Sequence, residues 1–484
     1  MQNYSRQTKM KHSGQVFTPT NIVKMMLDLC EYFGEHVRCC HIMENSCGNG
    51  AFLEEIVRRY CTNYLKNNSN KDILRHELQT YIHGIESDKS VYYECLGRLD
   101  KTAADFDIHF VQWDVKLQNA LEVSDYDGKM DFVVGNPPYV RVHNLKQSYH
   151  QVKQFHFTQG GMTDLYLAFF ELGFRMLKPD GKLVYITPNS WLSSLAAQNM
   201  RQYILETGKL AALVDMQHYQ AFEKATTYTL VSFFDRSKSH NKVKYYTFDP
   251  IDNEKVFVEN LSYGDFSIDG QFFLARRGQL QELRAIKSNG YPQKVFVKNG
   301  FATLADKIFI GNFPFSQYII PTLKASTGKW QKAFFPYDSQ GKPIDLQEIF
   351  SHKAVANYLQ DNKQTLLKGK TEQQNPQWYL YGRTQALKDV YSDKTAVNTI
   401  VKDIECVKVN FVPKGCGLYS GLYIMGNVPF EIIENHLKSN EFIEYLTLLR
   451  NYKSGGYYTF GSRDLQQYLN YKLFQHKQPF PHIS

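Results

Sequence analysis

The sequence has few cysteines and no long apolar run, and both absences exclude whole classes of protein. No stretch of eighteen consecutive apolar residues occurs, which excludes a transmembrane helix. The amino-terminal stretch MQNYSRQTKMKHSGQ is polar and lacks the apolar core of a secretory signal. The eight cysteines form no CxxC pair and no Cys/His cluster with zinc spacing, so we expect free thiols and no metal site. These features predict a cytoplasmic protein that does not associate with membranes.

The excess of basic over acidic residues lies entirely in the second half of the chain. Residues 1–240 carry 26 Lys and Arg and 26 Asp and Glu, whereas residues 241–484 carry 30 and 22, which accounts for the whole net charge of +8. A basic region beside a neutral one is typical of a module that binds a polyanion. On charge alone, an ordinary and mildly basic surface remains the alternative. Because 484 residues exceed one ordinary core, we expect two domains, 1–240 and 241–484.

Strand-like and helix-like segments alternate over the first 235 residues. The expected helices are 21–33, 50–66, 88–99, 164–177 and 196–206, and the expected strands are 41–43, 81–85, 110–112, 131–134, 182–187, 210–215 and 227–234. This alternation predicts a mostly parallel sheet with helices on both faces, whose ligands bind outside the carboxyl ends of the strands. The polar stretch DRSKSHNK that begins at residue 235 is interpreted as the start of a linker. Beyond it the alternation fades, which predicts an irregular α+β domain.

A turn with two glycines follows the first expected strand, in ENSCGNGAFL (44–53). Gly48 and Gly50 would let the backbone approach a ligand closely, and the next helix would present its amino-terminal amides. The pattern is neither the full GxGxxG of dinucleotide sites, because Leu53 occupies the third glycine position, nor a phosphate-binding loop. An ordinary strand-to-helix turn is the alternative.

Acidic residues follow the next two expected strands. Glu86 ends the strand in YIHGIESD, where a carboxylate commonly accepts hydrogen bonds from ribose hydroxyls. The alternative is a helix cap, a role that Ser87 or Asp88 could fill. Asp114 follows the third expected strand, where it could accept from an exocyclic amino group or be a common loop residue.

The fourth expected strand ends in the tetrapeptide NPPY, Asn136 to Tyr139. Pro137 and Pro138 cannot donate to a sheet ladder, so they end the strand and make its tip rigid. The side-chain oxygen of Asn136 and the carbonyl of Pro137 could both accept from one NH₂ group, and the ring of Tyr139 could lie against a planar substrate. Two such acceptors would localise the lone pair of a conjugated amine and make it a better nucleophile, which can lower a barrier by a few kcal/mol. A rigid turn without chemistry is the alternative.

Taken in order, these segments resemble the gamma-class N6-adenine DNA methyltransferases of restriction-modification systems, the TaqI-like and Eco57I-like type. GQVFTPTNIVKMML (14–27) resembles the methionine-pocket segment of that family, ENSCGNGAFL its cofactor loop, GIESD and QWD the next two cofactor segments, and NPPY the catalytic tetrapeptide. Residues 164–192 resemble the helix–strand unit that follows, and QAFEKATTYTLVSFF (220–234) resembles the segment with a base-stacking aromatic. Asn45 stands where the family usually has proline. More weakly, 297–311 and 449–470 resemble the two ends of the family's target-recognition domain.

The resemblance implies a Rossmann-like S-adenosylmethionine-dependent methyltransferase domain over 1–240, followed by an irregular α+β DNA target-recognition domain over 241–484. The residues that it assigns to S-adenosylmethionine are Phe17, Thr18, Pro19, Glu44, Asn45, Cys47, Gly48, Gly50, Glu86, Asp114 and Asn136. The target adenine would be flipped out of the duplex, gripped at N6 by Asn136 and Pro137, and stacked on Tyr139 and Phe222, with Tyr219 as the alternative stacker. Neither a metal nor a covalent enzyme intermediate is implied.

The implied partner is double-stranded DNA, bound by a monomer. Candidate phosphate contacts are Arg276, Arg277, Lys307 and Lys453, each of which could equally be a solvated surface residue. A separate restriction endonuclease is expected, because we find no metal-nuclease cluster and no spare amino-terminal domain to hold one. Two other functions stay open: a protein glutamine methyltransferase, which also uses NPPY, and a catalytically silent DNA-binding relative. The basic second half argues against the first, and the intact tetrapeptide and glycines argue against the second.

Overall fold

The computed structural model describes residues 18–141, 149–222, 227–288 and 290–475. The chain divides into two compact units, Met1–Gln281 and Glu282–Ser484, and each is described by itself. Phe17, one of the residues expected to bind the cofactor, lies outside the described residues. No helix in the described part of the chain combines the length and apolar character needed to cross a bilayer.

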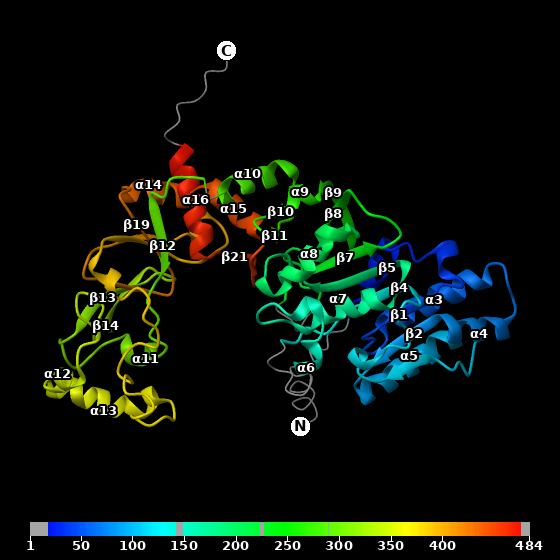
Figure 1. Cartoon of the computed structure of the whole chain (residues 1–484), viewed down its shortest axis with the longest axis horizontal. Helices are drawn as coiled ribbons and strands as arrows, with labels where there is room; N and C mark the ends of the chain where they lie inside the picture. The colour runs from blue at the N-terminus through cyan, green and yellow to red at the C-terminus, as the bar shows by residue number, and fades with distance from the viewer. Residues whose placement is uncertain (1–17, 142–148, 223–226, 289, 476–484) are drawn as a thin grey trace, which may run out of the picture. The chain divides into compact units, whose positions relative to one another are not determined.

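The first unit is built on one large sheet (Figure 1), in which the described residues form nine strands in the order β3-β2-β1-β4-β5-β7-β6-β8-β9. The strands are β1 (Ile42–Glu44), β2 (Ile82–Glu86), β3 (Asp114–Leu117), β4 (Met130–Gly135), β5 (Leu177–Pro188), β6 (Leu210–Asp215), β7 (Thr229–Asp235), β8 (Lys242–Asp249) and β9 (Glu254–Ser262). The first five strands of this order are parallel, β7 runs antiparallel between β5 and β6, and β9 runs antiparallel to β8. The expected mostly parallel sheet is confirmed.

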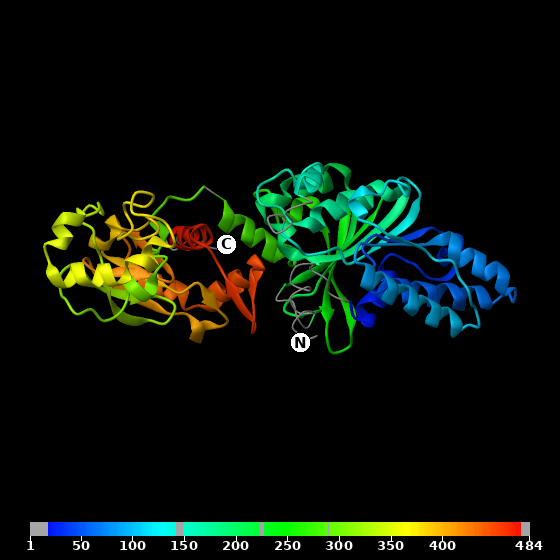
Figure 2. The same ribbon diagram turned by 90° about the horizontal axis from the view of Figure 1, so that it is seen from below.

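Helices cover both faces of this sheet (Figures 1 and 2). The helices of this unit are α2 (Thr20–Leu29), α3 (Ala51–Leu65), α4 (Lys71–Tyr81), α5 (Lys89–Ala104), α6 (Tyr149–Val152), α7 (Leu165–Met176), α8 (Gln198–Thr207) and α9 (Tyr263–Phe266). A further helix, α10 (Arg277–Lys287), contains the boundary between the two units. Successive β5 side chains point to opposite faces: Val184 joins the core cluster that contains α2 and α3, whereas Tyr185 contacts Phe170 of α7 with ring centroids 5.4 Å apart. Burial on both faces explains the continuous apolar run in β5.

The third strand lies later in the sequence than predicted. Residues 110–112 are not a strand, because Phe110 has a φ of +58° and its side chain is 93% exposed. A bulky side chain in the left-handed region cannot continue a β ladder. Pairing with β2 begins at Asp114 instead, opposite His83, and runs to Leu117, opposite Glu86. This shift decides where Asp114 lies.

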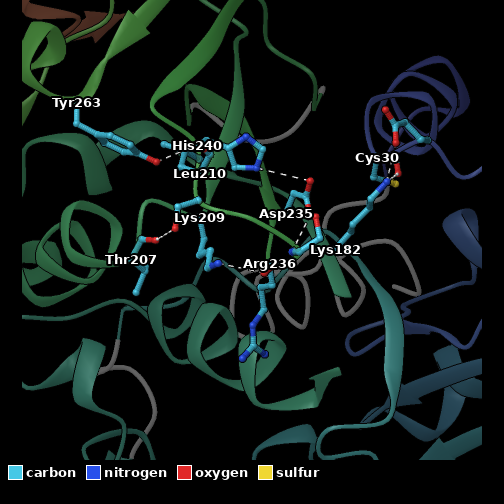
Figure 3. Close-up of polar contacts among 12 residues, drawn as sticks. Cys30, Lys182, Thr207, Lys209, Leu210, Asp235, Arg236, His240 and Tyr263 are labelled. Carbon is cyan, nitrogen blue, oxygen red and sulfur yellow. Dashed lines mark hydrogen bonds and ion pairs between the residues drawn. The ribbon is translucent and has the colours of Figure 1, made fainter. Parts of the chain in front are cut away.

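The segment predicted to start a linker is part of the first unit (Figure 3). The guanidinium of Arg236 donates to the carbonyls of Phe174 and Leu177 at 2.9 and 3.1 Å. Figure 3 shows Lys209 Nζ donating to the Arg236 carbonyl, a bond of 3.1 Å. Further on, Tyr263 Oη donates to the Leu210 carbonyl at 3.1 Å.

Two further strands after residue 240 extend the same sheet. β8 pairs with β6 in parallel, from Ala212 opposite Lys244 to Asp215 opposite Thr247, and β9 pairs with β8. The compact unit therefore ends after Gln281, and not at the boundary expected at residue 240.

The second unit is an α+β structure made of small sheets. Its strands are β12 (Val295–Asn299), β13 (Ile319–Lys324), β14 (Lys329–Phe334), β15 (Lys394–Val397), β16 (Ile400–Val401), β17 (Val409–Val412), β18 (Gly417–Tyr419), β19 (Leu422–Gly426), β20 (Tyr452–Lys453) and β21 (Tyr457–Thr459). Its helices are α11 (Asp306–Phe309), α12 (Leu346–Phe350), α13 (Lys353–Leu367), α14 (Phe430–Leu437), α15 (Asn440–Leu449) and α16 (Ser462–Gln475). Asn470 of α16 accepts from the amides of Lys294 and Val295 at 2.8 and 3.1 Å, so the first strand and last helix of the unit lie side by side.

Candidate active site

Three polar residues expected in the site meet at one edge of the first unit's sheet. Glu44 ends β1, Glu86 ends β2 and Asn136 directly follows β4. These strands are parallel neighbours in the order β2-β1-β4, so their carboxyl ends share an edge. This is the edge at which ligands of such sheets bind.

The glycine loop after β1 has the conformation that its sequence requires. Gly48 has a φ of +52° and Gly50 a φ of +81°, both in the left-handed region that favours glycine. A Cβ on Gly50 would lie 2.7 Å from Cys95 Sγ, so α5 also excludes a side chain there. Cys47 contributes its backbone: its amide donates to the Ile85 carbonyl at 2.9 Å, and its buried thiol lies 4.0 Å from that of Cys95.

The Glu86 carboxylate links this loop to the residues that precede α5 through hydrogen bonds. Its Oε2 accepts from the Gly48 amide at 2.9 Å, and its Oε1 accepts from the amides of Ser87 and Asp88 at 2.8 and 2.7 Å. Asp88 itself caps α5, because its side chain accepts from the Ser90 and Val91 amides. The capping alternative thus applies to Asp88. A carboxylate offers about four acceptor positions, so Glu86 can also accept from a ligand hydroxyl.

Glu44 is a buried carboxylate, with 3% of its surface exposed. Burial raises its pKa well above the ordinary value of a glutamate. Its Oε2 has no hydrogen-bond partner among the described residues. An ionised carboxylate in such a position is stabilised by a cationic partner, and the ammonium of an amino acid moiety has the chemistry required. The neighbouring Asn45 is held in place, because its Nδ2 donates to Tyr185 Oη at 2.7 Å.

The tip of β4 is tied to the segment that precedes α2. Asn136 Nδ2 donates to Thr18 Oγ1 at 3.2 Å, and Ser46 Oγ donates to the Asn136 carbonyl at 3.3 Å. Pro19 is the N-cap of α2, and its carbonyl accepts from the Val23 amide at 3.1 Å. Since the amide group is planar, fixing its nitrogen on Thr18 turns its oxygen to the opposite side. The structure therefore brings Thr18, Glu44, the glycine loop, Glu86 and the tetrapeptide together, as the sequence predicted.

The two expected stacking rings touch each other. Tyr139 and Phe222 have ring centroids 6.1 Å apart and planes inclined at 65°, an edge-to-face contact. Phe222 is 2% exposed and belongs to the core, so a base can enter between the rings only if one of them moves. Tyr139 Oη donates to the Ile186 carbonyl at 3.1 Å, and burial raises the pKa of this phenol. The alternative stacker, Tyr219, packs against Phe248 at 4.9 Å.

Asp114 does not lie with these residues. It begins β3, three residues before the position that pairs with Glu86, and therefore lies at the amino end of the strand. Its Oδ2 lies 2.6 Å from His83 Nδ1, and its Oδ1 accepts from Tyr126 Oη at 2.9 Å. Despite partial burial, the bonds from His83 and Tyr126 lower its pKa. The expected assignment of Asp114 to the cofactor is thus unsupported by its position.

Asn119 lies just beyond the carboxyl end of the third strand, where Asp114 was expected. The adjacent Gln118 amide donates to the Glu86 carbonyl at 3.0 Å. The Asn119 side chain caps a short 3-10 turn by accepting from the Leu121 amide at 3.2 Å, and its Nδ2 lies 3.4 Å from Gln151 Oε1. The signal that could have identified it is the N-cap pattern Asn-Ala-Leu-Glu after DVKL.

The candidate phosphate contacts are spread over separate elements. Arg276 and Arg277 lie at the start of α10 in the first unit, and the Arg277 guanidinium faces Asp265 at 3.5 Å. Lys307 on α11 and Lys453 on β20 are exposed in the second unit. Within the described residues, no group of three His, Cys, Asp or Glu side chains could hold a metal ion.

Comparison with known proteins identifies the first unit. Residues 27–222 match the sequence model of the family described as Eco57I restriction-modification methylase. The chain carries an Eco57I-like methylase domain. Its curated relatives include the type II methyltransferase M.BstVI of Geobacillus stearothermophilus, 24% identical over 76% of this chain and 73% of that protein. Another is the type II restriction enzyme and methyltransferase RM.Eco57I of Escherichia coli, 22% identical over 89% of this chain but only 54% of that longer protein.

Solved structures support the same fold for the Eco57I-like chain. The type IIL restriction-modification enzyme MmeI in complex with DNA superimposes with a TM-score of 0.62 at 12% identity, over 92% of this chain and 63% of that one. A DrdV–DNA complex gives a TM-score of 0.57 at 13% identity, over 99% of this chain and 60% of that one. The Rossmann-like methyltransferase fold with an additional unit, expected from the sequence, is confirmed.

Proposed function

We propose that this Eco57I-like chain is a site-specific DNA methyltransferase, which transfers a methyl group from S-adenosylmethionine to N6 of an adenine in a short duplex sequence. The observation that carries the proposal is the bond from Asn136 to Thr18 beside the glycine loop, because it fixes an amide oxygen next to the carboxyl ends of β1, β2 and β4. The names of the relatives, type II methyltransferases, support DNA as the substrate. The methyl donor supplies a methyl group on a positively charged sulfur.

The residues at this edge fit S-adenosylmethionine. Glu44 offers a buried carboxylate to the ammonium of its methionine moiety, and Thr18 and Asn45 flank the same end. Glu86, on the strand beside the glycine loop, would accept from the ribose hydroxyls. We assign the adenine end to Asn119 in place of Asp114, since Asn119 lies at the carboxyl end of β3.

The protein's part in the reaction is to position one amine and to polarise it. A flipped adenine would stack on Tyr139, with Phe222 displaced from its present edge-to-face contact. Asn136 Oδ1 and the Pro137 carbonyl would accept the two N6 hydrogens and draw the nitrogen toward tetrahedral geometry. Attack on the methyl carbon breaks its bond to sulfur, and the surplus proton on N6 then passes to solvent. No strong general base is needed, because the methylated nitrogen is a strong acid.

Adenine N6 is the proposed target, although the tetrapeptide chemistry alone would serve cytosine N4 equally. We further propose a cognate restriction endonuclease as the biological partner and a monomer as the DNA-bound form. A protein glutamine methyltransferase would have no use for a second unit with 25 Lys and Arg against 16 Asp and Glu over residues 282–484.

The deciding experiment is to express the chain in a host without DNA methylation and to map modified bases by single-molecule sequencing. We expect N6-methyladenine at one short motif, and its loss with Asn136→Ala. Modification of cytosine at one motif would overturn adenine as the target base and support DNA methylation as the reaction. An unmodified genome beside abundant folded protein that binds S-adenosylmethionine would overturn DNA as the substrate.

A further inference from the structure

The second unit carries an exposed strand that mixes lysine and tryptophan. β14 begins with Lys329, Trp330, Gln331 and Lys332, all of them exposed, and only its last two residues are buried. It is the edge strand of the sheet β14-β13-β18, beside β13 in Figure 1. Trp330 is 48% exposed, whereas Trp191 and Trp378 are buried and Trp113 is partly buried. It is thus the most exposed tryptophan of the four in the chain.

Four lysines lie on this hairpin or beside its turn. Lys324 pairs with Lys329 across the hairpin turn, and Lys332 follows two residues after Trp330. Lys408, the residue before β17, lies beside the hairpin turn, because its Nζ donates to the Ser326 carbonyl at 3.3 Å. None of these lysines forms an ion pair with another described residue. The hairpin therefore carries positive charge that its own unit does not neutralise.

The outer edge of β14 is open only in its first half, because the Lys332 carbonyl accepts from the Gly311 amide at 2.9 Å and Ala333 bridges Ile310. Protection of the open part explains only part of this composition. Lysines on an edge strand discourage pairing with a second chain. A large exposed aromatic has the opposite effect, and Trp330 is not among the side chains packed against the described cores of this unit. Tryptophan flanked by lysines matches a partner that is negatively charged and has flat apolar faces, and nucleic acid has both properties.

The geometry of the hairpin suits a DNA duplex. Trp330 and Lys332 alternate with Lys329 and Gln331, so each face of the ribbon carries one lysine of β14. Gln331 is steadied by a hydrogen bond from Tyr419 Oη. Because β13 also pairs with β18, the hairpin is part of a three-stranded sheet, and β14 is the strand of this sheet that offers an exposed row of side chains to a duplex.

We propose that the β13–β14 hairpin is a DNA-contacting element of the second unit, with Lys329 and Lys332 on phosphates and Trp330 packed against the duplex. The proposal rests on the proposed function and adds the element that holds the DNA. It is distinct from the tetrapeptide site, which contacts only the flipped base.

The test measures duplex binding by the full-length chain as a function of salt, with the motif found by methylation mapping. The logarithm of affinity falls linearly with the logarithm of salt concentration, and each lost phosphate contact makes this fall less steep by about 0.9. Replacing both Lys329→Gln and Lys332→Gln should therefore reduce the steepness by about 2. The matched control removes two exposed lysines elsewhere in the unit, Lys353→Gln with Lys370→Gln, and should leave the slope unchanged. S-adenosylmethionine affinity, measured on every variant, should equal that of the wild type.

Trp330 has its own readout. Trp330→Ala should weaken duplex binding by about tenfold or more, and Trp330→Phe should restore part of the loss. DNA should also shield the wild-type tryptophan fluorescence from acrylamide, and this shielding should vanish in Trp330→Phe.

The outcomes separate the two proposals. A wild type that binds and methylates DNA, with an unchanged salt slope in the double lysine variant and no shielding of Trp330, overturns the hairpin proposal and leaves the function intact. A wild type that neither binds nor methylates duplex DNA overturns the proposed function, and the hairpin proposal with it.

Discussion

Asn136 Nδ2 donates a hydrogen bond of 3.2 Å to Thr18 Oγ1, across 118 residues of sequence. The bond joins the tip of β4 to the residue before the N-cap of α2. It therefore links the group proposed to act on the target amine with the segment proposed to hold the cofactor. Thr18 is a positioning residue in this arrangement, because it acts through the orientation of the Asn136 amide.

We predict that Thr18→Val lowers the rate of methyl transfer by roughly threefold to tenfold, since a net hydrogen bond is worth about 0.5–1.5 kcal/mol. Thr18→Ser keeps the hydroxyl and should restore most of the rate. Single-turnover methylation at saturating cofactor measures the effect. Equal rates in the valine and wild-type enzymes would show that Asn136 does not need this bond.

The positions of Asp114 and Asn119 predict opposite effects of replacing them. Asn119→Ala should weaken S-adenosylmethionine binding and leave thermal stability nearly unchanged. Asp114→Asn should leave cofactor affinity intact but destabilise the fold, because it removes a charge-assisted bond to His83 worth about 1.5–3 kcal/mol. Calorimetric titration and thermal unfolding of both variants distinguish the assignments. Loss of cofactor binding in Asp114→Asn at unchanged stability would return the role to Asp114.

The edge-to-face pair of Tyr139 and Phe222 predicts that base capture requires a ring to move. Tyr139→Ala should reduce turnover on duplex substrate by about tenfold or more, the value of one base–aromatic stack. Phe222→Leu should impair capture less and should also lower stability, because Phe222 is a core residue. Fluorescence of 2-aminopurine at the target position reports capture directly. Normal fluorescence and turnover in Tyr139→Ala would exclude stacking on that ring.

Alkaline pH should stabilise the second unit through Lys394. Burial lowers the pKa of this amine to about 8, and its Nζ donates to the carbonyls of Asp389 and Ser392, each at 2.9 Å. The unfolded chain keeps the proton up to pH about 10.4. It therefore binds more protons than the folded chain between these values, and the free energy of unfolding should rise with pH, by up to about 3 kcal/mol.

The matched variant is Lys394→Met, which keeps most of the length of the side chain but lacks the titratable amine. Chemical unfolding between pH 7 and 10 should show a smaller rise in stability for this variant than for the wild type. Parallel curves for the two proteins would mean that Lys394 keeps an ordinary pKa.

Local signals in the sequence predicted most of the arrangement of the candidate site. The glycines at 48 and 50, Glu86 after its strand and the tetrapeptide at 136–139 were all found, because each depends on a turn or strand end that a few residues specify. Asp114 was misplaced because a short strand can slide by a few residues without losing its apolar pattern. Only the left-handed φ of Phe110 and the pairing with β2 fix that register, and neither is visible in the sequence.

Long-range pairing accounts for the other differences. β8 and β9 belong to the first sheet because β8 pairs with β6 and β9 pairs with β8. The polar sequence of residues 235–242 does not indicate this pairing. The bond between Thr18 and Asn136 likewise follows from the fold. The edge-on packing of Phe222 depends on the core around it, which the sequence does not specify.

The two strands after residue 240 also set where such enzymes can be recombined. A chimera that exchanges the second unit at residue 240 would remove β8 and β9 and leave β6 as a bare edge, open to pairing with other chains. Because Gln281 lies inside α10, a junction placed after Lys287 keeps both this helix and the whole sheet of the first unit with their own sequence. Hybrids joined there should keep the fold of the first unit, so a different second unit could be attached without rebuilding this sheet.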